Sequence, residues 1–159
     1  MIVVSALLTL MYSCKYSEEY QVINIDNQFS VSVPSWMKKY DDLKQGAPFQ
    51  YANRYRNIYT VAEASKQELG DLMANTTSLL SKSMKNAVVS DSSSVTINGL
   101  PAVRTEVFGK MNEENIYFTE LVIQGKKSNY HLSIWTRGED RKLRYRDDIN
   151  KIAASFKEL

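Results

Sequence analysis

Two side chains that often take part in catalysis, His131 and Cys14, are each the only residue of their type in the 159-residue chain. Nucleophilic catalysis needs a base beside the nucleophile, and the sequence around His131 gives no Ser-His-Asp or Cys-His arrangement. Zinc would need several cysteine or histidine ligands at short spacing, and no segment resembles a calcium loop. The six glycines are dispersed and form no phosphate-binding loop. We therefore expect a protein that is not an enzyme, with no catalytic residues, no metal and no cofactor.

His131 fits two interpretations. It lies inside a predicted strand, where a half-buried position in a sheet is the simpler explanation. The alternative is a pocket formed with Trp135, Tyr117 and Arg104, which would bind a small molecule or an ion, or support weak hydrolysis. A deep pocket where these residues converge would favour the alternative. A flat apolar patch with a polar rim would favour a protein interface.

Arg54 and Arg56 stand among the tyrosines of residues 49–64, where basic and aromatic residues alternate. Such a surface suits an anionic ligand or a nucleic acid, although arginines in a turn more commonly protect a strand edge. With 20 basic and 18 acidic residues the formal charge is +2, too small and scattered to indicate a nucleic-acid partner. The candidate binding surface comprises Arg54, Arg56, Arg104, Tyr117, His131 and Trp135.

The first 12 residues are almost wholly apolar and are followed closely by Cys14. About a dozen apolar residues fall short of the roughly 20 that cross a bilayer, but they match the apolar region of a secretory signal. Residues 11–14 resemble a relaxed bacterial lipobox, although Tyr12 is bulkier than usual there and no lysine or arginine precedes the apolar run. The resemblance implies a signal peptide over residues 1–13 and a lipidated Cys14 that anchors the chain in a membrane.

Two alternatives for this segment are a buried first element with an incidental cysteine and an uncleaved signal anchor. With the lipobox interpretation, residues 14–21 form the lipidated cysteine and a polar tether, and residues 22–159 form a single globular domain. Glu18 and Glu19 resemble the surface-export tags of Bacteroidetes lipoproteins, while a solvated linker is the default interpretation. The expected location is the bacterial cell envelope, lipid-anchored and either periplasmic or surface-exposed.

The elements that position the candidate residues are mostly strands. Apolar residues recur at every second position between Val95 and Trp135, which predicts an antiparallel meander with turns at residues 98–99, 112–115 and 125–128. Apolar residues also alternate over residues 22–34 with a turn at residues 26–27, and the first strand of the domain is expected at residues 29–33. A hairpin is expected over residues 49–64 with its turn near residues 56–57.

Helices are expected at residues 35–43, 66–85 and 140–154. The middle helix would begin at a capping box over Ser65–Glu68 and lay one apolar stripe on the sheet as part of the core. Ser90–Ser94 is expected to be a polar loop. The prediction is an α+β protein in which a twisted antiparallel sheet of about six strands is flanked by helices.

Four short segments of the chain resemble the PsbP and Mog1-like superfamily. They are Phe29–Pro34, Ile97–Ala102, Tyr130–Trp135 and Ile152–Lys157. The resemblance implies an α/β/α sandwich and leaves activity open, because one fold hosts many functions. Together with the lipobox, it leads us to expect a non-catalytic envelope lipoprotein whose domain binds a protein partner or supports an envelope assembly. The alternative is the ligand pocket near His131 and Trp135.

Overall fold

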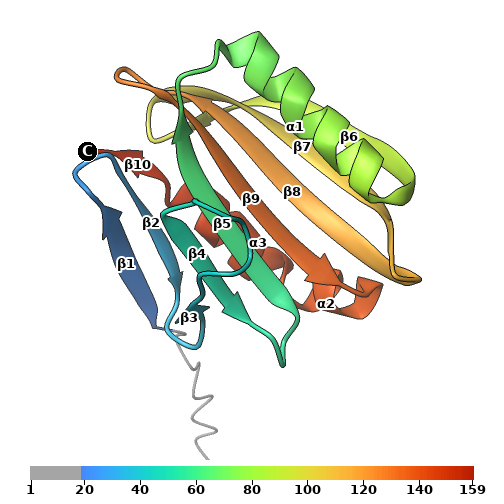
Figure 1. Ribbon diagram of the computed structural model, residues 1–159. Coiled ribbons are helices and arrows are strands. Elements are labelled where there is room, and N and C mark those ends of the chain that lie inside the picture. The colour runs from blue at the N-terminus through green and yellow to red at the C-terminus, as the bar shows by residue number, and fades with distance from the viewer. Residues whose placement is uncertain (1–18) are drawn as a thin grey trace, which may run out of the picture.

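The computed structural model describes residues 19–159, so the expected signal peptide and the lipidation site at Cys14 lie outside the described residues. Ten strands form two sheets in which all paired strands are antiparallel (Figure 1). The small sheet has the order β1 (Tyr20–Ile25), β2 (Phe29–Pro34) and β10 (Lys157–Glu158). The large sheet has the order β3 (Lys38–Lys39), β4 (Phe49–Asn53), β5 (Ile58–Ser65), β9 (Asn129–Arg137), β8 (Glu114–Gln124), β7 (Leu100–Met111) and β6 (Lys85–Ile97).

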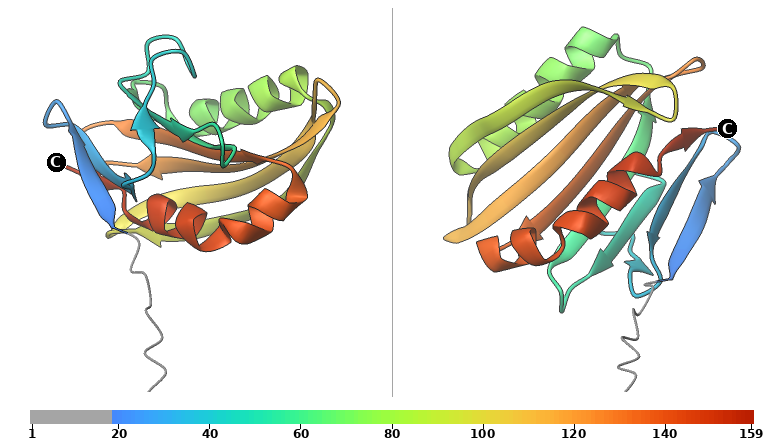
Figure 2. Two further views of the ribbon diagram at one scale, coloured as in Figure 1. Left: turned by 90° about the horizontal axis from the view of Figure 1, so that it is seen from below. Right: turned by 180° about the vertical axis from the view of Figure 1, so that it is seen from behind.

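Helices cover both faces of the large sheet. Helix α1 (Leu69–Ser83) lies on one face, and α2 (Glu139–Arg144) and α3 (Arg146–Ala154) lie on the other (Figures 1 and 2). The expected α+β class, an antiparallel sheet flanked by helices, is therefore confirmed. The large sheet has seven strands, because the chain adds the short β3 at one edge and the long β6 at the other.

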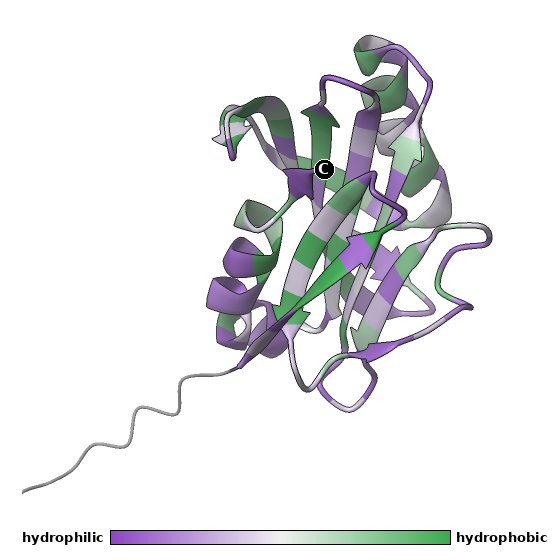
Figure 3. Ribbon diagram, turned by 90° about the vertical axis from the view of Figure 1, so that its left-hand side faces the viewer, coloured by the Kyte–Doolittle hydropathy of each residue, from purple (hydrophilic) through white to green (hydrophobic). Residues whose placement is uncertain are grey.

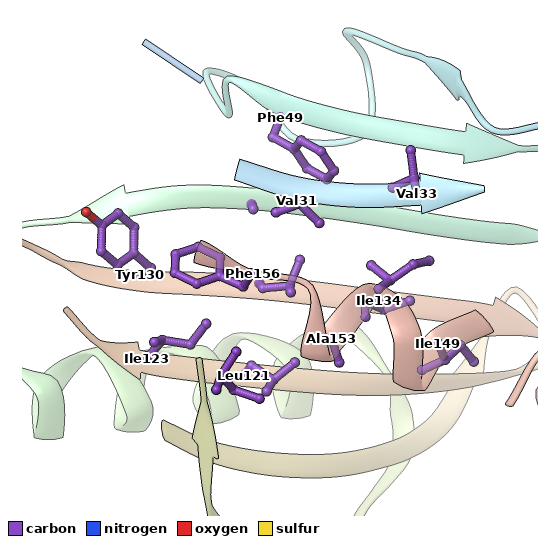
Figure 4. Close-up of a cluster of buried hydrophobic side chains, with 14 of the residues drawn as sticks. Val31, Val33, Phe49, Leu121, Ile123, Tyr130, Ile134, Ile149, Ala153 and Phe156 are labelled. Carbon is purple, nitrogen blue, oxygen red and sulfur yellow. The ribbon is translucent and has the colours of Figure 1, made fainter. Parts of the chain in front are cut away.

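The main core lies between the large sheet, the small sheet and α3. Phe29, Phe49, Leu132, Ile134 and Phe156 are fully buried there, and Figure 4 shows side chains from β2, β4, β8, β9 and α3 converging on this space. Strand residues alternate between this core and the opposite face, which gives the bands of high and low hydropathy along the ribbons in Figure 3. Burial of these apolar side chains is the largest favourable contribution to folding.

The face under α1 is packed more thinly. Within the 15-residue helix only Leu72 and Thr76 are buried, and Leu79 is 66% exposed. A small cluster of Met84, Val107, Ile116 and Phe118 fills one end of the space between helix and sheet. The expectation that the whole apolar stripe of this helix belongs to the core is therefore wrong, because part of the stripe borders an open groove.

Residues 35–43 form turns and the two-residue strand β3, so the helix expected there is wrong. The carbonyl oxygens of Trp36 and Met37 accept hydrogen bonds from the amide side chains of Asn53 and Gln21, at 2.9 and 3.0 Å. Lys38 pairs with β4. These tertiary partners take up backbone groups that a helix would use internally.

The capping box at Ser65–Glu68 is also wrong. Ser65 is the last residue of β5, and its hydroxyl accepts a hydrogen bond from the Gln67 amide at 3.1 Å within a turn. Helix α1 begins at Leu69, three residues after the expected start. A serine hydroxyl can satisfy a turn amide as readily as a helix amide, so the local pattern does not fix where the helix begins.

Two further expectations differ from the structure. Ser90–Ser94 lies inside β6, where the backbone pairs with β7 through two register shifts, so it is not a loop. The expected helix over residues 140–154 is divided into α2 and α3 at Tyr145, whose ring packs against Trp36. At the other end of the chain β1 begins at Tyr20, two residues before the expected start of the domain.

Candidate functional site: a groove between helix α1 and the sheet

A groove of about 1110 Å³ runs between α1 and the face of the large sheet that α1 covers. Strands β5, β8 and β9 supply its floor, α1 forms one wall, and the segment before β4 contributes Asp42, Leu43 and Lys44 to its lining. Because α1 buries few side chains, the helix stands over the sheet without filling the space beneath it. The volume slightly exceeds the usual range for ligand-binding clefts in proteins, roughly 300–1,000 Å³.

The wall before β4 is fixed by the buried side chain of Gln50. Its Oε1 accepts hydrogen bonds from the backbone amides of Leu43 and Lys44, both at 2.9 Å. Its Nε2 donates to the carbonyl oxygens of Lys44 and Ala47, both at 2.8 Å. One side chain therefore satisfies four backbone groups of a segment that has no regular secondary structure.

The floor carries a chain of charged groups that extends from the interior to solvent. Glu120 on β8, whose side chain is 3% exposed, binds His131 Nε2 on β9. His131 Nδ1 lies 4.0 Å from Oε1 of Glu63 on β5, and Glu63 in turn binds the Lys44 ammonium. Negative and positive groups alternate along this chain, which keeps the buried charges compensated.

The same neighbours shift the pKa values of the two central groups. Burial opposes the charge of His131, but the carboxylates of Glu120 and Glu63 outweigh it and raise its pKa to about 9. The His131 imidazolium, followed by the Lys44 ammonium, lowers the pKa of Glu63 to about 2, against the opposing effect of partial burial. At neutral pH the groove floor therefore holds a protonated histidine and an ionised glutamate.

Ser133 is the hydroxyl nearest in sequence to His131 on the groove side of β9, and its hydrogen bond goes to Glu120 instead of to the histidine ring. Its Oγ donates to Glu120 Oε1 at 2.5 Å, so the carboxylate lies between the hydroxyl and the imidazole. In a Ser-His-Asp site the base contacts the nucleophile directly. A histidine that stays protonated at neutral pH is also unsuited to accept a proton. The hydrogen bond between hydroxyl and imidazole that such a site uses is therefore replaced here by two hydrogen bonds to Glu120.

Three aromatic rings lie side by side across the groove floor. Trp135 on β9 stacks on Tyr59 of β5, with ring centroids 5.3 Å apart and planes 10° apart. Its other neighbour is Phe118 of β8, with a centroid distance of 5.5 Å and an interplanar angle of 25°. The strands pair Trp135 directly with Tyr59 and Phe118, which places all three side chains on one face.

The six residues of the candidate binding surface divide between the two faces of the sheet. His131 and Trp135 line the groove, and Arg54 stands at its rim, bound to Asp42 at 2.9 Å. Arg56 stacks over the Trp36 ring at 4.2 Å, outside the groove lining. The groove thus brings together three of the six candidates.

Arg104 and Tyr117 lie on the opposite face of the sheet. Arg104 binds Glu106, with 2.9 Å between Nε and Oε1, while Val103, the residue before it, faces α1. Tyr117 stacks with Phe108, and it precedes Phe118 of the groove floor. The expectation that these two residues share a pocket with His131 is wrong, because neighbouring strand residues point to opposite faces.

Sequence reasoning missed Glu120, Glu63 and Ser133 as members of the site. A signal for Glu120 was present: it is an acidic residue within the largely apolar part of β8, residues 116–123, and buried carboxylates almost always have partners. The identity of that partner depends on the pairing of Glu120 with Ser133 across β8 and β9. Alternation within one strand does not give this register.

Comparisons with known proteins identify the fold. The chain aligns with cyanobacterial PsbP from Synechocystis sp. PCC 6803 at 12% identity and a TM-score of 0.67, over 94% of this chain and 99% of that one. The Ran-binding protein Mog1p from Saccharomyces cerevisiae gives 10% identity and a TM-score of 0.57, over 89% and 96%. The chain thus has the fold of the PsbP and Mog1 proteins, as its sequence motifs predicted.

A third similar structure is LpqN, a Mycobacterium tuberculosis protein involved in cell envelope biogenesis, with 14% identity and a TM-score of 0.57 over 88% of this chain and 90% of that one. No protein-family model matches the sequence, and no curated protein matches it. At such low identities the likeness defines the fold and leaves the function open.

Two further findings concern residues 19–159. None of the helices in this part of the chain has the length and apolar character needed to span a bilayer. Within the same residues, no three histidine, cysteine, aspartate or glutamate side chains gather in a way that could hold a metal ion.

Proposed function

We propose that this chain is a non-catalytic binding protein of the bacterial cell envelope that holds a small-molecule ligand in the groove under α1. The observation that carries the proposal is the groove itself, with the buried His131 and Glu120 pair and the aromatic residues on its floor. A large cleft with apolar walls, a few convergent polar groups and shifted pKa values is typical of a ligand site. The groove therefore favours the pocket interpretation of His131 over a flat protein interface.

The chemistry of the floor supports binding over catalysis. Glu120 engages both Ser133 and His131, so the hydroxyl and the ring that a hydrolase would pair are each bound to the same carboxylate. The raised pKa of His131 keeps the ring protonated, and the lowered pKa of Glu63 keeps that carboxyl ionised. Neither group is poised to exchange a proton near neutral pH.

Photo-crosslinking at two matched positions tests the groove as the binding site. Leu79 at the groove wall and Val22 on β1 are both 66% exposed, and only Leu79 lines the groove. A photoreactive residue placed at either position in the producing cells would be followed by intact-mass analysis of the purified protein. A small-molecule adduct at position 79 and none at position 22 is expected. Equal labelling at both positions, or none at either, would contradict the proposal.

The cell-envelope location rests on the N-terminal sequence. Residues 11–14 resemble a lipobox, and a lipid on Cys14 would hold the domain at a membrane, either in the periplasm or at the cell surface. LpqN, which shares the fold, is itself involved in cell envelope biogenesis. Feeding cells an alkyne-tagged fatty acid should label the protein, and Cys14→Ala should abolish the label. Unchanged lipid incorporation in that variant would remove the anchor from the proposal.

A protein partner is the second candidate function. Its support is that Mog1p, with the same fold, is a Ran-binding protein, and that β6 is an end strand of the large sheet with Val88 and Val89 each 46% exposed. An end strand offers backbone groups to which a partner can add a strand. The photoreactive residue placed at Val88 should then give a protein adduct of defined mass. Adducts confined to position 79 would favour the groove alone.

A further inference from the structure

The charged side chains that line the groove are largely paired with one another. Arg54 binds Asp42 at 2.9 Å, and Arg137 binds Glu114 at 3.4 Å. The floor adds the contacts of Lys44 with Glu63 and of His131 with Glu120. The remaining charged lining residue, Lys66, is exposed. Because Lys66 is exposed, an ion pair with it would contribute little. A charged ligand on the groove floor would have to separate one of the other pairs or lose its own hydration without a partner there, and both cost free energy.

The floor still offers one donor and one acceptor side by side. Protonated His131 carries hydrogens on both ring nitrogens, and Nε2 is engaged by Glu120. Nδ1 lies 4.0 Å from Glu63 Oε1, which is beyond direct hydrogen-bond distance. The Nδ1 hydrogen and the Glu63 carboxylate therefore both remain able to bind a polar group in the groove. Such a group must accept from one and donate to the other, as a hydroxyl or a carboxamide does.

The remaining contacts would be apolar. The Trp135 ring is covered on its two sides by Tyr59 and Phe118, so these rings present edges to the groove and the Trp135 faces are occupied. A flat sugar ring would find no free tryptophan face to stack on. Val61 on the floor and Leu80 on the wall add aliphatic surface. This lining suits an extended apolar body.

We propose that the groove binds an uncharged amphiphile, an apolar chain or ring system whose hydroxyl or carboxamide group contacts His131 and Glu63. This inference rests on the proposed function, because it takes the groove as the ligand site. The contacts of His131 and Glu63 define the polar group of that ligand, which the overall shape of the groove does not. The two ion pairs at the rim, Arg54 with Asp42 and Arg137 with Glu114, then form a charge-neutral border that an uncharged molecule can pass.

Four ten-carbon probes that differ only in their polar group test the proposal. They are 1-decanol, decanamide, decanoate and decylammonium, titrated at pH 7.5 into the chain from residue 14 onward with Cys14→Ser, which removes the thiol that would carry the lipid. The chain has two tryptophans, and Trp36 lies outside the groove lining, so Trp36→Phe leaves Trp135 as a single fluorescent reporter. The alcohol and the amide should bind at least about tenfold more tightly than either ion, a difference of about 1.4 kcal/mol.

A charge variant separates recognition from folding. Glu63→Gln removes the negative charge between Lys44 and His131, so decanoate should gain at least about tenfold in affinity and approach decanol. Glu114→Gln is the matched control, because Glu114 also lines the groove but its side chain is 59% exposed and pairs with Arg137. Its affinities should change by less than about twofold, since exposed pairs contribute little.

Three outcomes would overturn the proposal. In the first, the ionic probes bind as tightly as the neutral ones. In the second, the Glu63→Gln variant keeps the same preference for neutral over ionic probes. In the third, the fluorescence of Trp135 responds to none of the four probes. The groove as a ligand site is judged separately by the crosslinking at position 79. An adduct there combined with a failed probe series would reject the uncharged amphiphile and keep the binding function.

Discussion

Glu120 and His131 lie on the same face of neighbouring strands, diagonally across the pairing of β8 and β9, and form a buried ion pair beneath helix α1. The pair lies on the thinly packed face of the sheet, away from the main apolar core. Burying two charges is costly unless they are paired and hydrogen-bonded, and Ser133 supplies an additional hydrogen bond to the carboxylate. The chain thus keeps a charged pair inside the groove, where an apolar pair of the same size would pack with less cost.

The first prediction concerns that pair. Glu120→Gln leaves His131 buried without its principal counter-charge, so the free energy of unfolding should fall by about 3 kcal/mol, as when a buried ion pair loses one partner. The pKa of His131 should fall from about 9 toward its ordinary value of 6.5. Because the chain has one histidine, a proton NMR titration of the imidazole reports this pKa without ambiguity.

Glu106→Gln provides the control for this measurement. Glu106 is a partly buried glutamate that binds Arg104 on the other face of the sheet. The variant should leave the His131 titration in place. A histidine pKa that moves equally in both variants would contradict the assignment of the shift to Glu120.

The second prediction is the dependence of stability on pH. Folding raises the pKa of His131 from 6.5 to about 9, so its contribution is fully present below pH 6.5 and is lost as pH rises through 9. Folding lowers the pKa of Glu63 from 4.5 to about 2, so that contribution is present above pH 4.5 and is lost as pH falls toward 2. Lys44, Glu63 and Glu120 are the charged groups that face the ring.

Urea denaturation should therefore give maximal stability between pH 4.5 and 6.5. Between pH 6.5 and about 9 the loss should be on the order of 3 kcal/mol, since each unit of pKa corresponds to about 1.4 kcal/mol. In His131→Gln the stability should change much less over the same interval. A wild-type chain that is equally stable at pH 6 and pH 9.5 would refute the paired state of the histidine.

The third prediction concerns the segment that Gln50 holds against the groove. Gln50→Leu leaves two amides and the Ala47 carbonyl without their partner, and leaves the Lys44 carbonyl with the Ala47 amide alone, which should cost about 2 to 3 kcal/mol of stability. Amide hydrogen exchange at Leu43 and Lys44 should become faster, because both amides donate to Gln50. Gln124→Ala changes an exposed glutamine and should alter neither property by a measurable amount. Unchanged exchange at these two amides in Gln50→Leu would show that other contacts fix the segment.

The strand meander could be predicted from sequence because its apolar residues alternate and its turns are short. Ser90–Ser94 could not be recognised as part of a strand, because serine and aspartate have low strand propensity and pairing with β7 decides the structure. The Ser92 and Thr105 hydroxyls contact each other across this pairing at 3.3 Å. Tertiary partners outweighed local preference there.

The candidate site was predictable only in part. His131 and Trp135 were recognised because they are rare residue types in an alternating strand, two positions apart from Ser133 on the same face. Glu120 belongs to β8 and Glu63 to β5, and their meeting with His131 follows from register, which one sequence does not reveal. The sequence analysis predicts Tyr117 at the site, whereas Phe118 lines the groove. A difference of one residue moves a side chain to the other face of the strand.

The fourth prediction compares two glycines that the fold uses differently. At Gly125, an added Cβ would lie 2.4 Å from the Ser128 carbonyl oxygen and 2.5 Å from the Tyr130 ring. These contacts are shorter than van der Waals separation and involve the backbone and a buried ring. Gly125→Ala should therefore lower the free energy of unfolding by about 1 to 3 kcal/mol, the usual cost of overpacking. At Gly70 in α1, no atom lies within 4 Å of the added Cβ.

Gly70→Ala should accordingly stabilise the protein by about 0.5 to 1 kcal/mol, because alanine favours the helix and restricts the unfolded chain. Thermal denaturation of both variants beside the wild type measures the two effects in one experiment. The two changes in the free energy of unfolding have opposite signs, because the added methyl group clashes with neighbouring atoms at Gly125 and only improves helix propensity at Gly70. Because α1 forms a wall of the groove, the ligand affinity of the Gly70→Ala variant, measured by Trp135 fluorescence, also shows whether a more stable helix changes binding. Equal destabilisation by both substitutions would mean that α1 is packed more tightly on the sheet than its exposed Leu79 indicates.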